Sequence, residues 1–201
     1  MSRSKRKASR WPMVLTLTAG LLVGAGSGWW AMAHAGARGY EHNGWVGSTV
    51  AGSVDADPWT RAQVAVRGLL ALTKSQAIYL TTHVDETGAP LREGCRYRVS
   101  GGAMPARWWS VTVYADDNYL PLNADDALSF DATEVRPDAA GRWTALLDNH
   151  RPAEGAWAST RNAGKFDITL RLYNPSAAAQ TDFSAIPLPR VTRIDCTGET
   201  A

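Results

Sequence analysis

The strongest alternation of apolar and polar positions runs from Arg107 to Tyr114, near the middle of the chain. It consists mainly of Val, Thr, Tyr and Trp, the residue types that strands favour. Successive side chains of a strand point to opposite faces, so we expect Trp109, Val111 and Val113 on one face and Trp108, Ser110, Thr112 and Tyr114 on the other. Because both faces carry bulky side chains, the pattern predicts an interior strand of an antiparallel sheet, with the Trp109 face in the core.

A second alternating run extends from Lys165 to Tyr173, and Pro175 ends it because proline cannot donate to a ladder. Shorter apolar runs, separated by turn residues, predict further strands at 78–84, 95–99, 128–130, 143–147 and 190–196. The turn residues at 85–90 predict a hairpin between the first two of these strands.

One soluble helix is predicted to start at Asp57-Pro58, with Asp57 as its cap and Pro58 at its first position, and Trp59 to Lys74 contains good helix formers. Its apolar stripe predicts packing against the sheet through Ala62, Val66, Leu69, Leu70 and Thr73. Many short strands with a single soluble helix predict a mainly β fold, an antiparallel β-sandwich or jelly roll with one packed helix.

An uncharged apolar segment of 18 residues runs from Met13 to Trp30, between tryptophans that favour membrane interfaces. At about 1.5 Å per residue, a helix of this length spans roughly 27 Å, close to the hydrocarbon thickness of a bilayer. Five Lys and Arg residues precede the segment and predict a cytoplasmic N-terminus. We therefore predict a basic cytoplasmic segment over 1–10, a single transmembrane anchor over 11–37, a linker over 38–57 in which Trp45 packs onto the domain, and an exported domain over 58–201.

A cleaved signal peptide is the alternative to the anchor, because Ala31-Met32-Ala33 and Ala33-His34-Ala35 both resemble small-residue cleavage sites. The domain is exported under either interpretation. If the segment is retained, glycines at a spacing of four predict self-association of the helix through Gly20, Gly24 and Gly28. A helix that is merely rich in small residues would show the same spacing.

The net charge of +2 conceals an acidic domain. Of the 21 Lys and Arg residues, five precede the apolar segment, which leaves 16 against 19 acidic residues. No nucleic-acid partner is therefore predicted. The motifs also predict no metal, cofactor or catalytic residue: His83 to Glu86 is interpreted as the solvated end of a hairpin, and Ser110 lacks the glycine-flanked elbow of a serine nucleophile.

The two cysteines, Cys95 and Cys196, both lie in the exported part. An oxidising compartment favours a disulfide between them, which would close a loop of about 100 residues. Two buried thiols too far apart to join are the alternative.

Aromatic residues are abundant, with nine Trp and six Tyr. Trp108 and Tyr114 lie on the polar side of the first strand, and Arg171 and Tyr173 on the polar side of the second. Aromatic side chains beside an arginine make a platform for a sugar, a lipid headgroup or a protein loop. We hypothesise that these four residues line a ligand cleft; ordinary packing within the sandwich is the alternative.

Several aromatic motifs follow one another in a characteristic order: Trp108 to Tyr114, Trp157, Phe166 to Pro175 with its Arg-Leu-Tyr-Asn-Pro ending, and Leu188-Pro189. In this order the chain resembles the bacterial family called domain of unknown function 1214. The resemblance implies a β-sandwich of the jelly-roll kind and brings no established catalytic residues. Ala156-Trp157-Ala158 departs from the Asn-Trp-Leu-Pro form associated with the family.

These observations predict a membrane-anchored, extracytoplasmic binding or structural module of the bacterial cell envelope. Its anchor would cross the inner membrane once, and its domain would lie in the periplasm. The sequence does not specify the ligand. An envelope hydrolase or isomerase acting on a small lipid or carbohydrate is the alternative, and a deeply buried carboxylate or histidine in a lined pocket would favour it.

Overall fold

The computed structural model describes residues 10–34, 40–48, 56–66 and 72–197. The chain divides into two compact units between Gly36 and Ala37. The first unit contains α1 (Trp11–His34), in which Trp11–Ala31 is long and apolar enough to cross a membrane. The predicted apolar helix is thus confirmed as a helix. Its self-association through Gly20, Gly24 and Gly28 stays a prediction.

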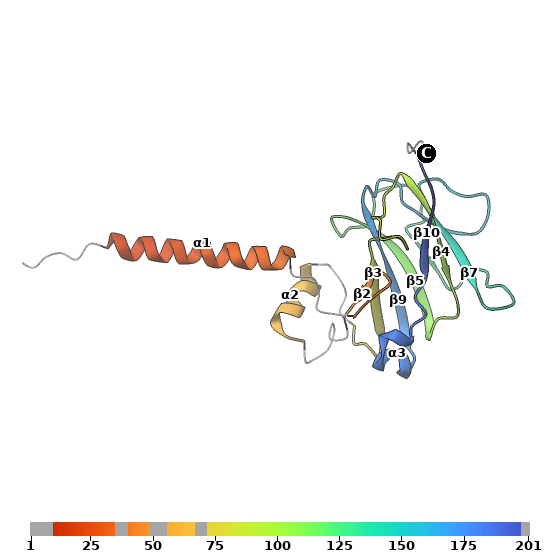
Figure 1. Cartoon of the computed structure of the whole chain (residues 1–201), viewed down its shortest axis with the longest axis horizontal. Helices are drawn as coiled ribbons and strands as arrows, with labels where there is room; N and C mark the ends of the chain where they lie inside the picture. Colours follow the sequence, from red (N-terminus) through yellow and green to blue (C-terminus); the bar gives the residue numbers. More distant parts are fainter. Residues whose placement is uncertain (1–9, 35–39, 49–55, 67–71, 198–201) are drawn as a thin grey trace, which may run out of the picture. The chain divides into compact units, whose positions relative to one another are not determined.

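The second unit is a β-sandwich built from two sheets (Figure 1). The large sheet has the order β1 (Tyr40–His42), β2 (Trp45–Gly47), β3 (Ala77–Thr82), β9 (Phe166–Pro175), β5 (Ala106–Ala115) and β6 (Ser129–Asp131). The small sheet has the order β10 (Arg190–Cys196), β4 (Cys95–Gly101), β7 (Trp143–Asp148) and β8 (Ala156–Ser159). Among the strands that the structure describes, only β7 and β8 pair in parallel. The predicted mainly β sandwich is confirmed, with this one pairing as an exception to its antiparallel pattern.

One hydrophobic core lies between the sheets. β5 contributes Trp109, Val111 and Val113, none of them more than 6% exposed. The alternating apolar residues of β9 are buried in the same core: Phe166, Ile168, Leu170 and Leu172. The predicted core face of β5 and the predicted polar side of β9, opposite these buried residues, are therefore confirmed, and β5 is an interior strand between β9 and β6.

The prediction of a hairpin at 85–90 is wrong, because the strands before and after this turn do not pair with each other. β3 and β4 belong to different sheets, and the turn between them closes with an isolated bridge between Val84 and Pro90. The chain crosses the sandwich here, so that Leu80 of β3 and Tyr97 of β4 enter the core from opposite sheets. Periodicity identifies the buried face of a strand but not the sheet that the strand joins.

Residues within the predicted linker form part of the sandwich. β1 and β2 make a hairpin with a two-residue turn, in which Asn43 and Gly44 have φ angles of 51° and 78°. β2 then pairs with β3 in the large sheet. Trp45 is 1% exposed, and its Nε1 donates a hydrogen bond to the carbonyl of Pro189 at 2.9 Å. The predicted packing of Trp45 onto the domain is confirmed.

The soluble helix α2 (Pro58–Val66) begins at the predicted residue, where the Asp57 carboxylate accepts from the backbone N–H groups of Trp59 at 2.8 Å and Thr60 at 3.0 Å. Leu69 and Leu70 of the predicted stripe lie outside the described residues. Thr73 is not helical, contrary to prediction, because its backbone N–H and hydroxyl bond to the Gln76 side chain in a turn. Packing of α2 on the sheet stays a prediction.

Two short helices follow β9 that the sequence pattern did not predict, α3 (Ala177–Thr181) and the 3-10 helix η1 (Phe183–Ala185). Each is capped by a side chain that accepts from its first turn, Ser176 for α3 and Asp182 for η1. They bury Ala179 and Phe183. At five and three residues, they are too short to show a helical period.

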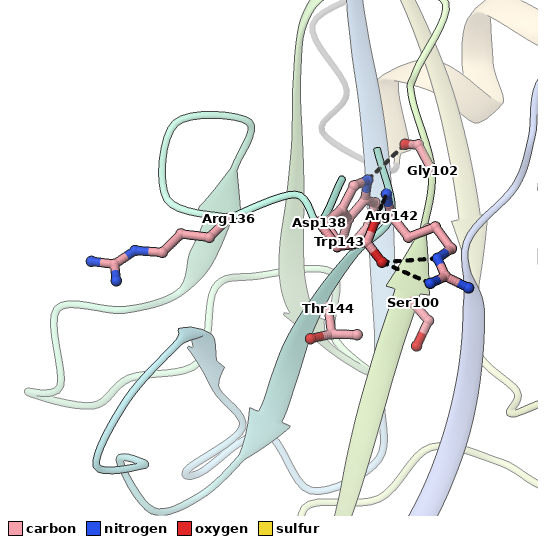
Figure 2. Close-up of a pocket in the computed structure, with 8 residues that line it drawn as sticks. Ser100, Gly102, Arg136, Asp138, Arg142, Trp143 and Thr144 are labelled. Atoms are coloured by element: carbon pink, nitrogen blue, oxygen red, sulfur yellow. Dashed lines mark hydrogen bonds and ion pairs between the residues drawn. The ribbon is translucent and has the colours of Figure 1, made fainter. Parts of the chain in front are cut away.

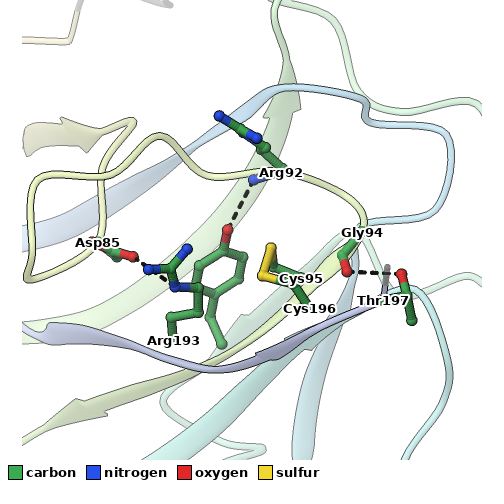
Figure 3. Close-up of a disulfide and its surroundings, with 8 residues drawn as sticks. Asp85, Arg92, Gly94, Cys95, Arg193, Cys196 and Thr197 are labelled. Carbon is green, nitrogen blue, oxygen red and sulfur yellow. Dashed lines mark hydrogen bonds and ion pairs between the residues drawn. A yellow bond between two sulfur atoms is a disulfide. The ribbon is translucent and has the colours of Figure 1, made fainter. Parts of the chain in front are cut away.

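A disulfide joins Cys95 at the start of β4 to Cys196 at the end of β10 (Figure 3). The two residues are opposite each other in the ladder, with their Cα atoms 3.9 Å apart. The structure thus forms the pairing predicted from the sequence, and this bond fastens the edge strand of the small sheet.

Gly101 allows the close approach of β4 to Trp143. A Cβ at Gly101 would lie 2.3 Å from Cζ2 of Trp143, whose indole is buried and donates to the Gly102 carbonyl at 2.7 Å. We therefore expect Gly101→Ala to lower the free energy of unfolding by about 1–3 kcal/mol. Urea denaturation followed by tryptophan fluorescence measures this change. Gly102→Ala is the matched control, because its Cβ would meet nothing within 4 Å; equal destabilisation by both substitutions would contradict the prediction.

Candidate ligand site on the outer face of the large sheet

The outer face of the large sheet carries the side chains of β3, β9 and β5 that point away from the core. The register aligns them in rows across the strands: Ala77-Tyr173-Trp108, Tyr79-Arg171-Ser110, Thr81-Thr169-Thr112 and Asp167-Tyr114. The four predicted site residues therefore share one face, and each is partly exposed. We name the following set the aromatic–arginine face: Tyr79, Trp108, Thr112, Tyr114, Arg171 and Tyr173.

Arg171 lies at the centre of this face. Its Nη1 donates to Oγ1 of Thr112 at 2.7 Å, and its Nη2 donates to the hydroxyl of Tyr114. The guanidinium carbon lies 5.4 Å from the ring centroid of Tyr114 and 6.0 Å from that of Tyr79, within cation–π range. The ion pairs of the described residues include none with Arg171. Hydroxyl groups and aromatic rings hold this cation in place of a carboxylate.

Tyr79 is the member of the face that the sequence did not reveal. Burial is the largest cause that raises the pKa of Tyr79, and the nearby Tyr173 and Tyr114 raise it further against the opposing effect of Arg171. These contributions show that the Tyr79 phenol is partly desolvated and lies close enough to Arg171 and the other two phenols to interact with them. A strand is predicted at 78–84, but only the register of β3 on β9 places Tyr79 opposite Arg171.

Trp108 and Tyr173 form the second part of the face. They are paired across the β5–β9 ladder, and their ring centroids lie 5.1 Å apart at an interplanar angle of 49°. Together they present a half-exposed apolar surface in the row next to Arg171. The four predicted residues are thus brought together as two contacting pairs, and their role as a ligand cleft stays a prediction.

An open pocket of about 610 Å³ lies elsewhere, beside the ends of β4 and β7 (Figure 2). None of the predicted site residues lines it. Its Asp138 and Arg142 form an ion pair at 2.8 Å, and Figure 2 shows Arg136 directed away from them. Hydrogen bonds from Arg142, the largest from its backbone N–H, hold the pKa of Asp138 below its usual value. These contacts close a turn, so we assign this carboxylate a structural role.

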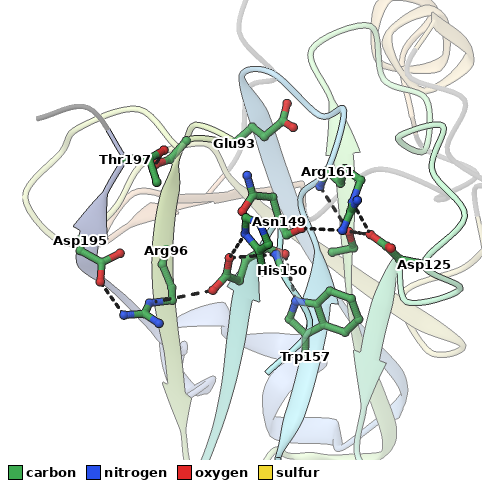
Figure 4. Close-up of polar contacts among 12 residues, drawn as sticks. Glu93, Arg96, Asp125, Asn149, His150, Trp157, Arg161, Asp195 and Thr197 are labelled. Carbon is green, nitrogen blue, oxygen red and sulfur yellow. Dashed lines mark hydrogen bonds and ion pairs between the residues drawn. The ribbon is translucent and has the colours of Figure 1, made fainter. Parts of the chain in front are cut away.

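A polar network ties together the loops at one end of the sandwich (Figure 4). Asp125 accepts from the Ser159 hydroxyl at 2.6 Å and from Nε of Arg161 at 3.0 Å, and Arg161 also donates to the Asn149 carbonyl at 3.1 Å. The hydrogen bond from Ser159 is the largest cause that lowers the pKa of Asp125. Ser159 therefore donates to a carboxylate instead of a histidine base, and His150 is exposed. The network fastens loops and lacks the arrangement of a nucleophile with its base.

Asp85 is the buried carboxylate of the turn after β3, at 3% exposure (Figure 3). The solvated hairpin end predicted at His83–Glu86 is thus wrong at this residue. Its Oδ1 accepts from the Thr87 hydroxyl at 2.6 Å and from the backbone N–H groups of Thr87 and Ala89, and its Oδ2 lies 3.6 Å from Nε of Arg193. Burial alone would raise the pKa of Asp85, but these hydrogen bonds and Arg193 lower it overall. Asp85 is an ionised group that organises a turn, and it lines no part of the pocket at β4 and β7.

No group of three or more His, Cys, Asp or Glu side chains that could hold a metal occurs within the described parts of the chain. The aromatic–arginine face offers cationic and hydroxyl donors, which are unsuited to a metal ion. Its chemistry suits a ligand with acceptor atoms and an apolar body.

Comparison with known proteins gives a family and a fold. The family model described as "Protein of unknown function (DUF1214)" matches residues 76–177. The crystal structure of the VPA0106 protein from Vibrio parahaemolyticus is similar, with a TM-score of 0.56 and 21% identity over 70% of this chain and 36% of that one. An uncharacterized protein from Burkholderia cenocepacia has a TM-score of 0.40 and 17% identity over 63% of this chain and 31% of its own. The chain spans about a third of the length of these two proteins. No curated protein matches the sequence.

Proposed function

The chain belongs to the DUF1214 family, and from that premise we propose that it is a membrane-anchored, extracytoplasmic binding module of the bacterial cell envelope that holds a ligand on the aromatic–arginine face. The observation that carries this proposal is Arg171, a partly buried cation held by Thr112 and Tyr114. A cation in a partly desolvated position is costly unless a partner offsets the loss of water. A bound ligand supplies that partner.

The proposed location rests on α1 and on the disulfide. α1 has the length and apolar composition of a membrane span, and five basic residues precede it. Disulfides persist in oxidising compartments. We propose that α1 stays as a single-pass anchor of the inner membrane, with residues 1–10 in the cytoplasm and the sandwich, including β1 and β2, in the periplasm. Detection of a mature chain that begins near His34 or Gly36 would instead show cleavage of a signal peptide.

Fluorine NMR of the full-length protein in micelles tests the ligand site. The tryptophans are replaced by 5-fluorotryptophan, and the Trp108 and Trp157 resonances are assigned with Trp108→Phe and Trp157→Phe. A panel of sugars, lipid headgroups, carboxylic acids and short peptides is then titrated. We expect a ligand that shifts the Trp108 resonance but not that of Trp157, which belongs to β8 of the small sheet. If no compound shifts the Trp108 resonance selectively, the proposed site is refuted.

A further inference from the structure

We propose that the ligand of the aromatic–arginine face carries an oxyanion, a carboxylate or a phosphate, that binds to Arg171. This inference rests on the proposed function and specifies the chemistry of its ligand. Three features of the face support it: the charge of Arg171, the two hydroxyl groups that accept its hydrogen bonds, and the rings around it.

The charge of Arg171 has no counterion among the described residues. Other arginines of the sandwich pair with carboxylates, such as Arg161 with Asp125 at 3.0 Å and Arg190 with Glu86 at 3.2 Å. Asp167 is the carboxylate of the same face. It lies across the ladder from Tyr114 and has an interaction of its own, and the ion pairs of the described residues include none between it and Arg171. A guanidinium that is partly shielded from water and lacks a carboxylate attracts an anion from solution.

The polar groups around Arg171 suit a ligand that is rich in hydrogen-bond acceptors. A guanidinium has five N–H donors, and the hydrogen bonds of Arg171 to described residues use two of them. Thr112 and Tyr114 accept these two hydrogen bonds, so each hydroxyl keeps its own hydrogen to donate. Neither hydroxyl donates to another described residue. The partly exposed Arg171 and Tyr114 therefore present donors, with the buried Thr112 hydroxyl beside them, an arrangement that suits the several lone pairs of a carboxylate or phosphate.

The rings add shielding and a second contact. Tyr79 and Tyr114 both lie within cation–π distance of the guanidinium, and they reduce its contact with water. This environment strengthens an ionic hydrogen bond relative to one in bulk solvent. The Trp108–Tyr173 pair in the neighbouring row offers an apolar surface to the rest of the ligand. We infer that a compound with a planar or apolar body and one anionic end fits the face best.

The test compares benzoate with benzamide, a neutral compound of similar shape, by titration of the full-length protein in micelles with the Trp108 resonance as readout. We expect benzoate to bind about tenfold or more tightly than benzamide, because only benzoate forms charge-assisted hydrogen bonds with Arg171. Arg171→Gln should remove this preference. Arg98→Gln is the matched control, since Arg98 is an exposed arginine of β4 in the other sheet, and it should leave the preference unchanged.

A second substitution, Tyr114→Phe, keeps the ring and removes one hydroxyl, so we expect it to weaken benzoate binding several-fold. For both variants, an unchanged set of the remaining fluorotryptophan resonances shows that the sandwich is folded. The source of the oxyanion is distinguished by adding inorganic phosphate to micelles and, separately, by placing the protein in nanodiscs with or without phosphatidylglycerol. Binding of free phosphate supports a soluble anion, whereas a shift that appears only with phosphatidylglycerol supports a lipid headgroup.

Equal affinity for benzoate and benzamide, unaffected by Arg171→Gln, would overturn the inference. If a neutral compound shifts the Trp108 resonance while benzoate, phosphate and phosphatidylglycerol do not, the inference falls and the proposed ligand site stands. If no compound of either panel shifts that resonance, both fall.

Discussion

The double substitution Cys95→Ala/Cys196→Ala is expected to lower the free energy of unfolding of the sandwich by about 4–5 kcal/mol. The two cysteines are 101 positions apart, so their bond restricts most of the unfolded domain. In the chain-entropy description, the loss of a cross-link over so long a loop is among the largest effects that one covalent bond can have. Urea denaturation of the full-length protein in micelles, followed by tryptophan fluorescence without reductant, measures the change.

Wild-type protein unfolded in the presence of reductant is the control for this prediction. Its urea midpoint should fall to that of the double variant, because both lack the cross-link. Alanine is chosen because Cys95 is buried, and a serine hydroxyl there would add the cost of an unsatisfied polar group. A loss of less than about 1 kcal/mol would contradict the prediction and would mean that residual structure restricts the unfolded chain even without the disulfide.

Trp109→Ala is expected to lower the free energy of unfolding by about 3–5 kcal/mol. The Trp109 indole stacks on Trp143 at 4.5 Å between ring centroids and meets the edge of Phe130 at 6.3 Å. Its removal leaves a cavity where the two sheets meet, because Trp109 belongs to the large sheet and Trp143 to the small one. The same denaturation experiment measures this loss.

The neighbouring substitution Trp108→Ala removes an indole of the same size from the opposite face of β5. Trp108 is partly exposed and contacts Tyr173, so we expect a loss of about 1 kcal/mol. The difference between the two losses in the free energy of unfolding thus measures how much more the core face of β5 contributes to stability than its outer face does. Similar losses for Trp108→Ala and Trp109→Ala would contradict the assignment of a core face and an outer face to β5.

The strands with strong alternation could be predicted from the sequence, because every second residue in the middle of β5 and β9 is an apolar side chain of the core. β8 could not be predicted in this way, because all four of its residues are buried and three of them are small, so the strand shows no alternation of apolar and polar positions. The hairpin β1–β2 had a signal that was missed: Asn43-Gly44 is a strong mark of a two-residue turn, but the glycine-rich surroundings led to a linker assignment.

The sequence was enough to predict four residues of the candidate site, but only part of their arrangement in space. Alternation placed Trp108 and Tyr114 on one face of their strand and Arg171 and Tyr173 on one face of theirs. It could not show that the two faces coincide, because that depends on the pairing of β5 with β9. Tyr79 was missed for the same reason, since its place depends on the pairing of β3 with β9.

The position of β9 has a consequence for the order of folding. β3 and β5 do not pair with each other, and each pairs with β9, which lies between them in the large sheet. Contacts between segments so far apart in sequence form slowly, because the intervening chain must first be brought together. Because synthesis proceeds from the N-terminus, β3 and β5 are also made long before β9, the strand that lies between them. The nascent domain stays incomplete, with two unpaired strand edges, until residues 166–175 have emerged.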